Sequence, residues 1–388
     1  MDTRAHERQG PAPHGMVSPR PVLTAVLGAC VAAALVAGLL GGLLRAGIVP
    51  PGTSGSGWVA QGASWHAALM MCGFLGTVIS VERAVAARRA GAWVAPLLSG
   101  AAGLALLAGA DALARVLLPA AAAVFAAVNL LLWRLQRAPH TVVLGASALA
   151  WLAGNLSFAA GAPSHAVLPW WFAFLVLTIA AERLEMTRLM RRRPGAQATL
   201  YAVLALLAAG AGLSGLQPVP GGILFGAALL ALALWLLAFD IARRTVRADG
   251  LSRYMAVCLL AGYGWLAVGG TAWMASALGQ PARDAALHAL GLGFIFSMIM
   301  GHAPVILPAV ARVKLQFGAW FYLPLALLHG SLLLRLGAGF ADSGSRAQGA
   351  AWNALAILLF AATVVASALV WRRRHGGRRI TRNSPCAP

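Results

Sequence analysis

Long apolar segments alternate with short polar connections along almost the whole chain. Twelve such segments can be delimited, each ended by Gly, Pro or charged residues. They cover residues 22–45, 62–83, 92–110, 113–133, 141–161, 167–184, 199–215, 221–240, 253–277, 285–311, 318–338 and 351–371. Because a membrane-spanning helix needs about 20 apolar residues, this pattern predicts an all-α polytopic bundle of about twelve transmembrane helices.

The same pattern divides the chain into three parts. Residues 1–21 form a polar tail, residues 22–371 the twelve-helix domain, and residues 372–388 a basic tail. The first apolar segment is too long for the apolar core of a signal peptide, so we expect it to remain as the first helix.

Composition supports this fold class. Of 388 residues, 60% are hydrophobic and 10% are charged. Soluble domains contain roughly 45–50% apolar residues and roughly 25% charged residues. The mean hydropathy is +0.78. The four cysteines have no paired spacing, so the sequence predicts neither a disulfide framework nor a zinc motif.

The distribution of the net charge of +20 predicts the orientation. Arg residues gather in every second connection and in both tails, whereas the alternate connections contain Gly, Ser, Pro and Asp. Under the positive-inside rule the Arg-rich side and both termini are cytoplasmic. This spread excludes a nucleic-acid surface. With the Arg and Ala bias it predicts a multi-pass protein of the bacterial inner membrane, with the lipid bilayer as its partner.

A weak internal repeat is also present. Glu82-Arg83 ends the second segment, and Glu182-Arg183 ends the sixth; the tenth segment follows after four more helices. This spacing suits three four-helix repeats, which would be typical of a haem-copper oxidase-like fold. The alternative is that these charged residues only cap the cytoplasmic ends of two helices and extend to water.

Histidines inside the spans are the first functional candidates, because ionisable residues there are costly. His66 follows Gly62 by four residues, and His288 follows Asp284 by four, each at the outer start of its segment. At about 1.5 Å per residue, both lie roughly 6 Å below the outer boundary. Equal depth on two helices is what axial ligation of one haem requires, so we expect a b-type haem there.

Outward-facing arginines provide partners for the carboxylates of such a haem. Charge-assisted hydrogen bonds to a carboxylate favour guanidinium groups. The outer connections and helix ends contain Arg45, Arg115, Arg283 and Arg335. Arg335 is the best placed of the four, because it lies near the outer end of the eleventh segment.

His302 and His329 form a second candidate pair. His302 lies about four helical turns beyond His288, roughly 21 Å along the axis, so these two cannot bind one metal. Counted from the cytoplasmic boundary, His302 and His329 each lie about 15 Å deep. This predicts a second metal site, with copper as its metal, or a polar substrate pocket, although Pro304 and Pro308 are able to break the tenth segment. Each of the four histidines also has a purely structural interpretation, a hydrogen bond to a neighbouring helix.

Two segments resemble the NnrS family of twelve-span bacterial membrane haem and copper proteins. The resemblance rests on Trp65-His66-Ala67 through Met70 and Gly73-Phe74, and on Ala286-Leu287-His288-Ala289-Leu290 through Gly293, Ile295 and Met298. It implies that His66 and His288 are haem or metal ligands in a protein linked to nitric oxide metabolism. Two departures stand out. Ala68 and Leu69 replace the family's second His and its Glu, and Gly301-His302 continues into Ala303-Pro304 instead of Thr-Gly-Arg.

Together these features favour an integral membrane protein that binds haem, with copper as a second metal. Nitric oxide tolerance, metal handling and electron transfer are the expected roles, with nitric oxide or a small redox partner; whether it is an enzyme stays open. A secondary transporter of a small solute also has twelve spans and Pro-broken helices. A scaffold with structural histidines is the third possibility. The His-His and His-x-His motifs of haem-copper oxidases are absent, so dioxygen reduction is not expected.

Overall fold

The computed structural model describes residues 21–186 and 194–376, and within these ranges every regular element is helical. The elements of the first half are α1 (Pro21–Arg45), α2 (Gly57–Ser64), α3 (His66–Ala68), η1 (Leu69–Gly76), α4 (Thr77–Ala87), η2 (Ala90–Trp93), α5 (Val94–Leu107), α6 (Asp111–Leu135), α7 (Pro139–Ala159) and α8 (Ser164–Met186). Those of the second half are α9 (Ala196–Leu216), α10 (Pro218–Phe239), α11 (Ala242–Thr245), α12 (Gly250–Ala277), α13 (Arg283–His288), η3 (Ala289–Phe296), α14 (Ser297–Val310), η4 (Ala319–Phe321), α15 (Tyr322–Leu333), η5 (Leu334–Ala338), α16 (Gly339–Ala341) and α17 (Ser343–Gly376). The tails predicted at 1–21 and 372–388 lie largely outside the described residues.

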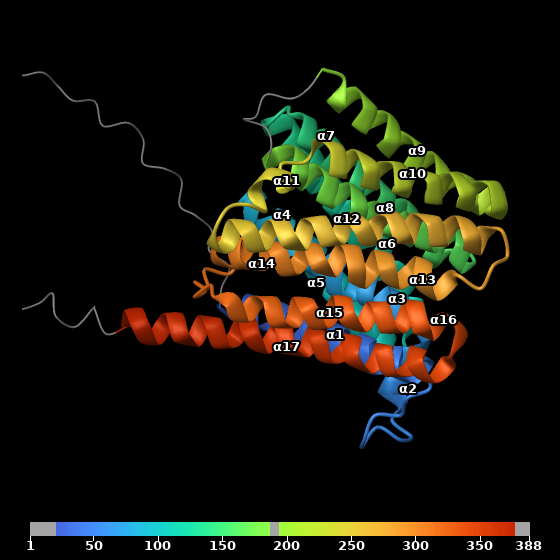
Figure 1. The fold of residues 1–388 in the computed structure, drawn as a ribbon, viewed down its shortest axis with the longest axis horizontal. Coiled ribbons are helices and arrows are strands. Elements are labelled where there is room, and N and C mark those ends of the chain that lie inside the picture. Colours follow the sequence, from blue (N-terminus) through green and yellow to red (C-terminus); the bar gives the residue numbers. More distant parts are fainter. Residues whose placement is uncertain (1–20, 187–193, 377–388) are drawn as a thin grey trace, which may run out of the picture.

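Twelve of the helical stretches in the described ranges are long and apolar enough to cross a membrane. This confirms the predicted all-α polytopic bundle. The helices lie roughly parallel or antiparallel to one another, with α1 beside α17, so the first and last spans are neighbours (Figure 1).

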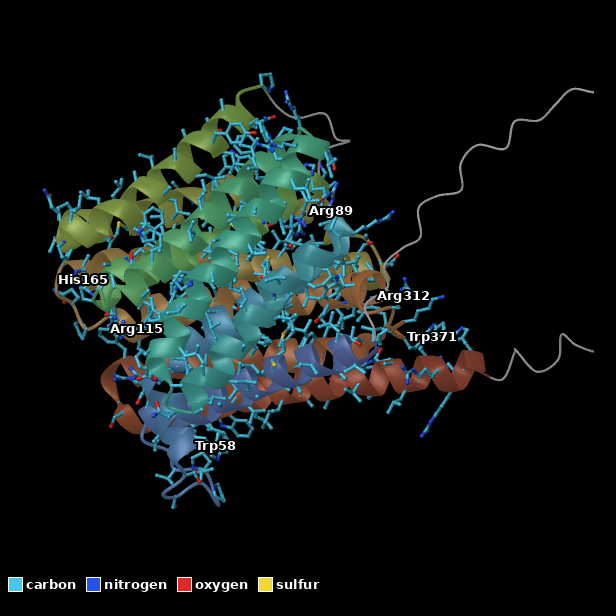
Figure 2. The ribbon with its side chains drawn as sticks, turned by 180° about the vertical axis from the view of Figure 1, so that it is seen from behind. Trp58, Arg89, Arg115, His165, Arg312 and Trp371 are labelled. Atoms are coloured by element: carbon cyan, nitrogen blue, oxygen red, sulfur yellow. The ribbon has the colours of Figure 1, made fainter. Side chains whose placement is uncertain are left out.

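The two ends of the bundle differ in the way that the charge pattern predicts. Arg89, Arg312 and Trp371 lie at one end, whereas Trp58, Arg115 and His165 lie at the other (Figure 2). The start of α1 and the end of α17 are at the Arg-rich end (Figure 1). The structure therefore supports an even number of crossings, while the assignment of this end to the cytoplasm stays a prediction.

The second, sixth and tenth spans form the centre of the bundle. Within their most apolar windows, 67% of residues are buried in His66–Ala87, 83% in Ser164–Met186 and 61% in Arg283–Val310. Each of the other nine spans has a lower buried share in its window. The three central spans are thus four helices apart, as three four-helix repeats require.

The last span differs from its predicted boundary. Residues 339–349 are expected to be an outward loop, but α17 already begins at Ser343. The Asp342 carboxylate explains the early start, because it accepts hydrogen bonds from the backbone N–H groups of Gly344 (3.2 Å) and Ser345 (2.6 Å). An Asp at this position satisfies N–H groups that have no partner inside the helix.

Pro304 and Pro308 do not break the tenth span. Both lie inside α14, which continues to Val310. The irregular part of this span is instead the π-helix η3, which comes before α14 and contains no proline.

Candidate functional site

Three π-helical segments gather the predicted haem-site residues at the end of the bundle that is opposite the Arg-rich end and predicted to face outward, called the outer end below. The π-helix η1 begins three residues after His66, η3 begins directly after His288, and η5 contains Arg335. π-helical backbone is rare in proteins and occurs frequently at functional sites. α3, α13 and α16, which adjoin these segments, lie at the same end of the bundle (Figure 1).

The two imidazoles predicted to share a haem lie next to each other. The ring centroids of His66 and His288 are 6.4 Å apart, and the ring planes differ by 33°. Two imidazoles that bind one metal from opposite sides have centroids roughly 6 Å apart, because each metal–nitrogen bond is about 2.0 Å and each nitrogen is about 1 Å from its ring centre. The spacing therefore suits one metal between the two rings.

The hydrogen bonds of both rings leave Nε2 as the nitrogen with the lone pair. Nδ1 of His66 lies 2.7 Å from the carbonyl oxygen of Gly38. Nδ1 of His288 lies 2.9 Å from Oδ1 of Asp284 and 3.0 Å from the Asp284 carbonyl oxygen. Because these oxygens only accept, each Nδ1 carries the proton. Metal-binding histidines usually have this arrangement, with the second nitrogen donating to a carbonyl or a carboxylate.

Packing against α1 holds the His66 ring in place. A Cβ atom added to Gly42 would lie 2.9 Å from Cε1 of His66, which is closer than real Cβ contacts. The ring therefore occupies space that only a glycine leaves open. Gly38 and Gly42 are one helical turn apart, so one face of α1 both orients His66 and makes room for it.

Two of the four outward arginines lie beside the imidazole pair. Arg335 donates from Nε to Oδ2 of Asp284 (3.0 Å) and from Nη2 to Oδ1 (2.8 Å). Nη2 also lies 3.1 Å from Nε2 of His288. Arg45 donates to the carbonyl oxygen of Ala63 (3.4 Å) and lies within electrostatic range of His66.

The other two outward arginines are engaged elsewhere. Arg115 donates to the carbonyl oxygen of Phe158 (2.7 Å), and its guanidinium lies 5.2 Å from the centre of the Phe158 ring. Arg283 donates to Oγ of Ser164 (2.9 Å). Of the four candidate arginines, Arg45 and Arg335 are therefore the two that lie beside the imidazole pair.

His302 and His329 are not brought into contact in the described structure. Nδ1 of His329 accepts a hydrogen bond from the Trp265 indole (2.9 Å), which leaves the proton on Nε2, 3.4 Å from Oγ of Ser297. His302 is 6% exposed, and its Nδ1 lies 2.8 Å from the Met298 carbonyl oxygen. The His329 ring contacts Ser297 and the His302 ring contacts Met298, which are adjacent residues of α14, so the equal depth of this pair stays a prediction. With Nδ1 accepting from Trp265 and the proton on Nε2, His329 has no lone pair left for copper.

A buried ion pair lies near His302 and includes a residue that the sequence analysis did not use. Arg183 donates from Nε to Oδ2 of Asp240 (2.8 Å) and from Nη2 to Oδ1 (3.1 Å), and the side chains are 5% and 2% exposed. The neighbouring Arg83 pairs with Glu82. Arg183 therefore does not extend to water, which excludes the capping interpretation for the second of the two Glu-Arg pairs.

Asp284 is the functional residue that sequence reasoning missed, since it was used only to mark a helix boundary. The signal was present, because Asp284 and His288 are four residues apart and such residues face each other on a helix. Gly38 was missed for a different reason: its contact with His66 joins two spans and has no signature in either one.

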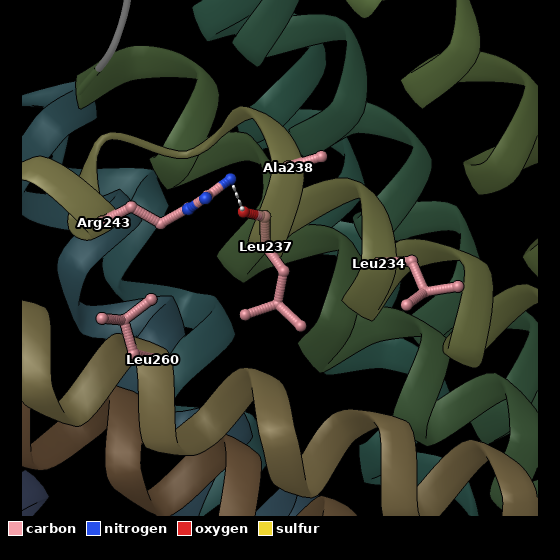
Figure 3. Close-up of a pocket in the computed structure, with 5 residues that line it drawn as sticks. All are labelled: Leu234, Leu237, Ala238, Arg243 and Leu260. Carbon is pink, nitrogen blue, oxygen red and sulfur yellow. Dashed lines mark hydrogen bonds between the residues drawn. The ribbon is translucent and has the colours of Figure 1, made fainter.

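Other features of the described residues do not add a site of this kind. No group of three or more His, Cys, Asp or Glu side chains that could hold a metal ion occurs in the described ranges. A shallow hollow between α10, α11 and α12 is lined by four apolar side chains and Arg243, which donates to the Leu237 carbonyl oxygen (3.2 Å; Figure 3). None of the four intramembrane histidines lines it. A haem needs only two axial protein ligands, so the imidazole pair fits it without a third.

The chain belongs to the family described as a domain of unknown function (DUF8744), whose model matches residues 23–369. No curated protein and no solved structure matches the chain. The match covers the whole imidazole pair and its arginines, but the family's description names no function.

Proposed function

We propose that the protein is an integral membrane haem protein with His66 and His288 as the axial ligands. One observation carries the proposal: two imidazoles with ring centroids 6.4 Å apart, each with Nδ1 on an oxygen acceptor and the lone pair on Nε2, which in His288 accepts a hydrogen bond from Arg335. Two histidines with purely structural roles would not need to lie next to each other, and would not need to use the same ring nitrogen, Nδ1, for their hydrogen bonds.

Each part of the site has a defined task in this proposal. Gly38 and Asp284 orient the two rings, and Gly42 leaves room for His66. Arg45 and Arg335 are the partners for haem carboxylates, since guanidinium groups form charge-assisted hydrogen bonds with them. When bound, a haem with two histidine ligands supplies one-electron chemistry at the iron.

Electron transfer is the role that this ligand set supports best. If His66 and His288 both held the haem iron, the group would supply electron transfer instead of a site for substrate conversion. Nitric oxide becomes a ligand only if one histidine is released, which links this proposal to the nitric oxide metabolism that the NnrS resemblance implies. Copper is not part of the proposal, because the Trp265 indole N–H lies on Nδ1 of His329 and Nε2 carries the proton, so no second imidazole with a lone pair on Nε2 joins His302.

The test is an absorption spectrum of the detergent-purified protein together with elemental analysis. We expect a Soret band, the sharp visible bands of a low-spin six-coordinate haem after reduction, and iron in equal molar amount to protein. A preparation from haem-replete cells that has no Soret band and no iron would contradict the proposal.

A further inference from the structure

The charge around the imidazole pair is positive. Arg45 and Arg335 each contribute one positive charge, and both lie within electrostatic range of His66. Asp284 contributes one negative charge, and it is the carboxylate that hydrogen-bonds to His288 and Arg335 among the described contacts. Two positive charges and one negative charge leave a net charge of about +1 beside two neutral rings.

The Arg335 guanidinium is hydrogen-bonded to Nε2 of His288, the nitrogen through which His288 would bind a metal. Its Nη2 lies 3.1 Å from Nε2 of His288, so the guanidinium covers the lone pair. The Arg335 side chain is 11% exposed and is held by two hydrogen bonds to Asp284. Because Nη2 has two hydrogens, it can give up Nε2 and still keep its bond to Asp284. The positive charge therefore stays next to any metal that takes Nε2.

These contacts distinguish two classes of metal ligand. A bare copper or zinc ion brings only positive charge to Nε2 and meets the guanidinium at close range. A metal complex with its own carboxylates brings negative charge, and the N–H released from Nε2 and the exposed Arg45 can bind to it.

We infer that the site selects an anionic metal complex, a carboxylate-bearing metalloporphyrin, over free metal ions, and that Arg335 makes this selection. The inference rests on the proposed function and adds the class of ligand. It assigns to Arg335 a role in specificity, not only in affinity, and to Asp284 the role of keeping that charge in place.

The test compares three probes on the apo full-length protein in detergent. The probes are ferric protoporphyrin IX, the same porphyrin as its dimethyl ester, and Cu(I) delivered from a competing chelator. We expect the wild type to bind the diacid at least tenfold more tightly than the ester. We expect it to take up no copper from the chelator. For Arg335→Gln, we expect the affinity for the diacid to fall toward that for the ester, with Arg45 still able to bind one carboxylate, and copper binding to appear.

Matched variants separate charge from folding. Arg283→Gln removes an outward arginine on the same helix as His288 that bonds to Ser164, and it should leave all three affinities unchanged. Arg335→Lys keeps the charge without the two-pronged contact, so it should still exclude copper. If Arg335→Gln binds the ester as tightly as the wild type does and gives a low-spin spectrum, the variant is folded and both imidazoles are in place.

The outcomes distinguish the two proposals. Equal affinity of the wild type for diacid and ester, or equal copper affinity in wild type and Arg335→Gln, overturns the selection by Arg335 and leaves the haem proposal standing. Failure of the wild type to bind either porphyrin overturns the haem proposal and the inference with it.

Discussion

The outer and inner histidine pairs look alike in the sequence but differ in what their ring nitrogens contact. His66 and His288 share a gap, and each has Nδ1 on an oxygen. His329 instead lies between Trp265 and Ser297, while His302 bonds to the backbone of its own helix. Burial in the membrane is common to both pairs. Nδ1 of His302 also lies on a carbonyl oxygen, so the feature that distinguishes the outer pair is that its two imidazole rings lie next to each other.

The surrounding charges differ as well. The outer pair contacts an ion pair that is partly open to water, with Asp284 33% and Arg335 11% exposed. The ion pair near His302 joins Arg183 to Asp240, and both side chains are nearly completely buried. The outer ion pair can exchange partners with a ligand, whereas the inner one has the character of a structural link between α8 and the end of α10.

Removal of an outer imidazole should have the largest effect. His288→Ala deletes one axial ligand, so we expect haem to be lost during purification, a decrease in affinity of at least a hundredfold. The ratio of Soret absorbance to protein concentration measures the haem that is retained. Elution of the variant as a single species in size-exclusion chromatography shows that it is folded. His165→Ala removes an exposed histidine at the same end and should keep full haem content. Retention of the six-coordinate spectrum in His288→Ala would contradict the ligand assignment.

The buried ion pair should give the largest effect on stability. Asp240→Ala leaves Arg183 buried without its carboxylate partner, and breaking such a pair typically costs about 3–5 kcal/mol. Thermal unfolding in detergent would measure the loss. Asp249→Ala is the matched control, because Asp249 is exposed and its side chain does not cap α12. The folded fraction of Asp240→Ala should still show an unchanged haem spectrum if the two regions are independent.

The inner histidine should matter for stability and not for the cofactor. His329→Ala leaves the partly buried Trp265 indole N–H without its acceptor, which costs up to about 1–3 kcal/mol, the range for a fully buried donor. We expect a lower unfolding temperature with the same haem spectrum and the same iron content. A shift of the Soret band, or loss of iron, would show that the inner pair is coupled to the outer one.

The smallest effect is expected from a single methyl group on α1. Gly42→Ala places a Cβ 2.9 Å from Cε1 of His66 and forces the ring to move. We expect haem affinity to fall about tenfold, which corresponds to about 1.4 kcal/mol. Gly28→Ala, on the same helix, meets no atom within 4 Å and should bind haem like the wild type. Equal affinities of the two variants would mean that α1 does not position His66.

The imidazole pair of the outer site could be predicted from the depth of each histidine along its helix. Counting residues from the outer boundary brought His66 and His288 to one level, because a helix rises evenly along its axis. Counting did not show whether His302 and His329 face each other, because contact between two rings also depends on the direction that each side chain takes from its helix. Position along the helix singled out Arg335 among the four outward arginines, but it did not give the contacts of Arg335 with Asp284 and His288, because the direction of a long side chain depends on what it contacts.

What the sequence by itself determined is the number of crossings, their order and the spans that carry ionisable residues. The thickness of a bilayer imposes a length of about 20 apolar residues on each helix, so these properties follow from local composition. Only the tertiary structure decided which nitrogen of each histidine is free, where the π-helices occur, and which arginines reach the pair. Those features depend on contacts such as His66 with Gly38 and Arg335 with Asp284, which join residues far apart in the chain.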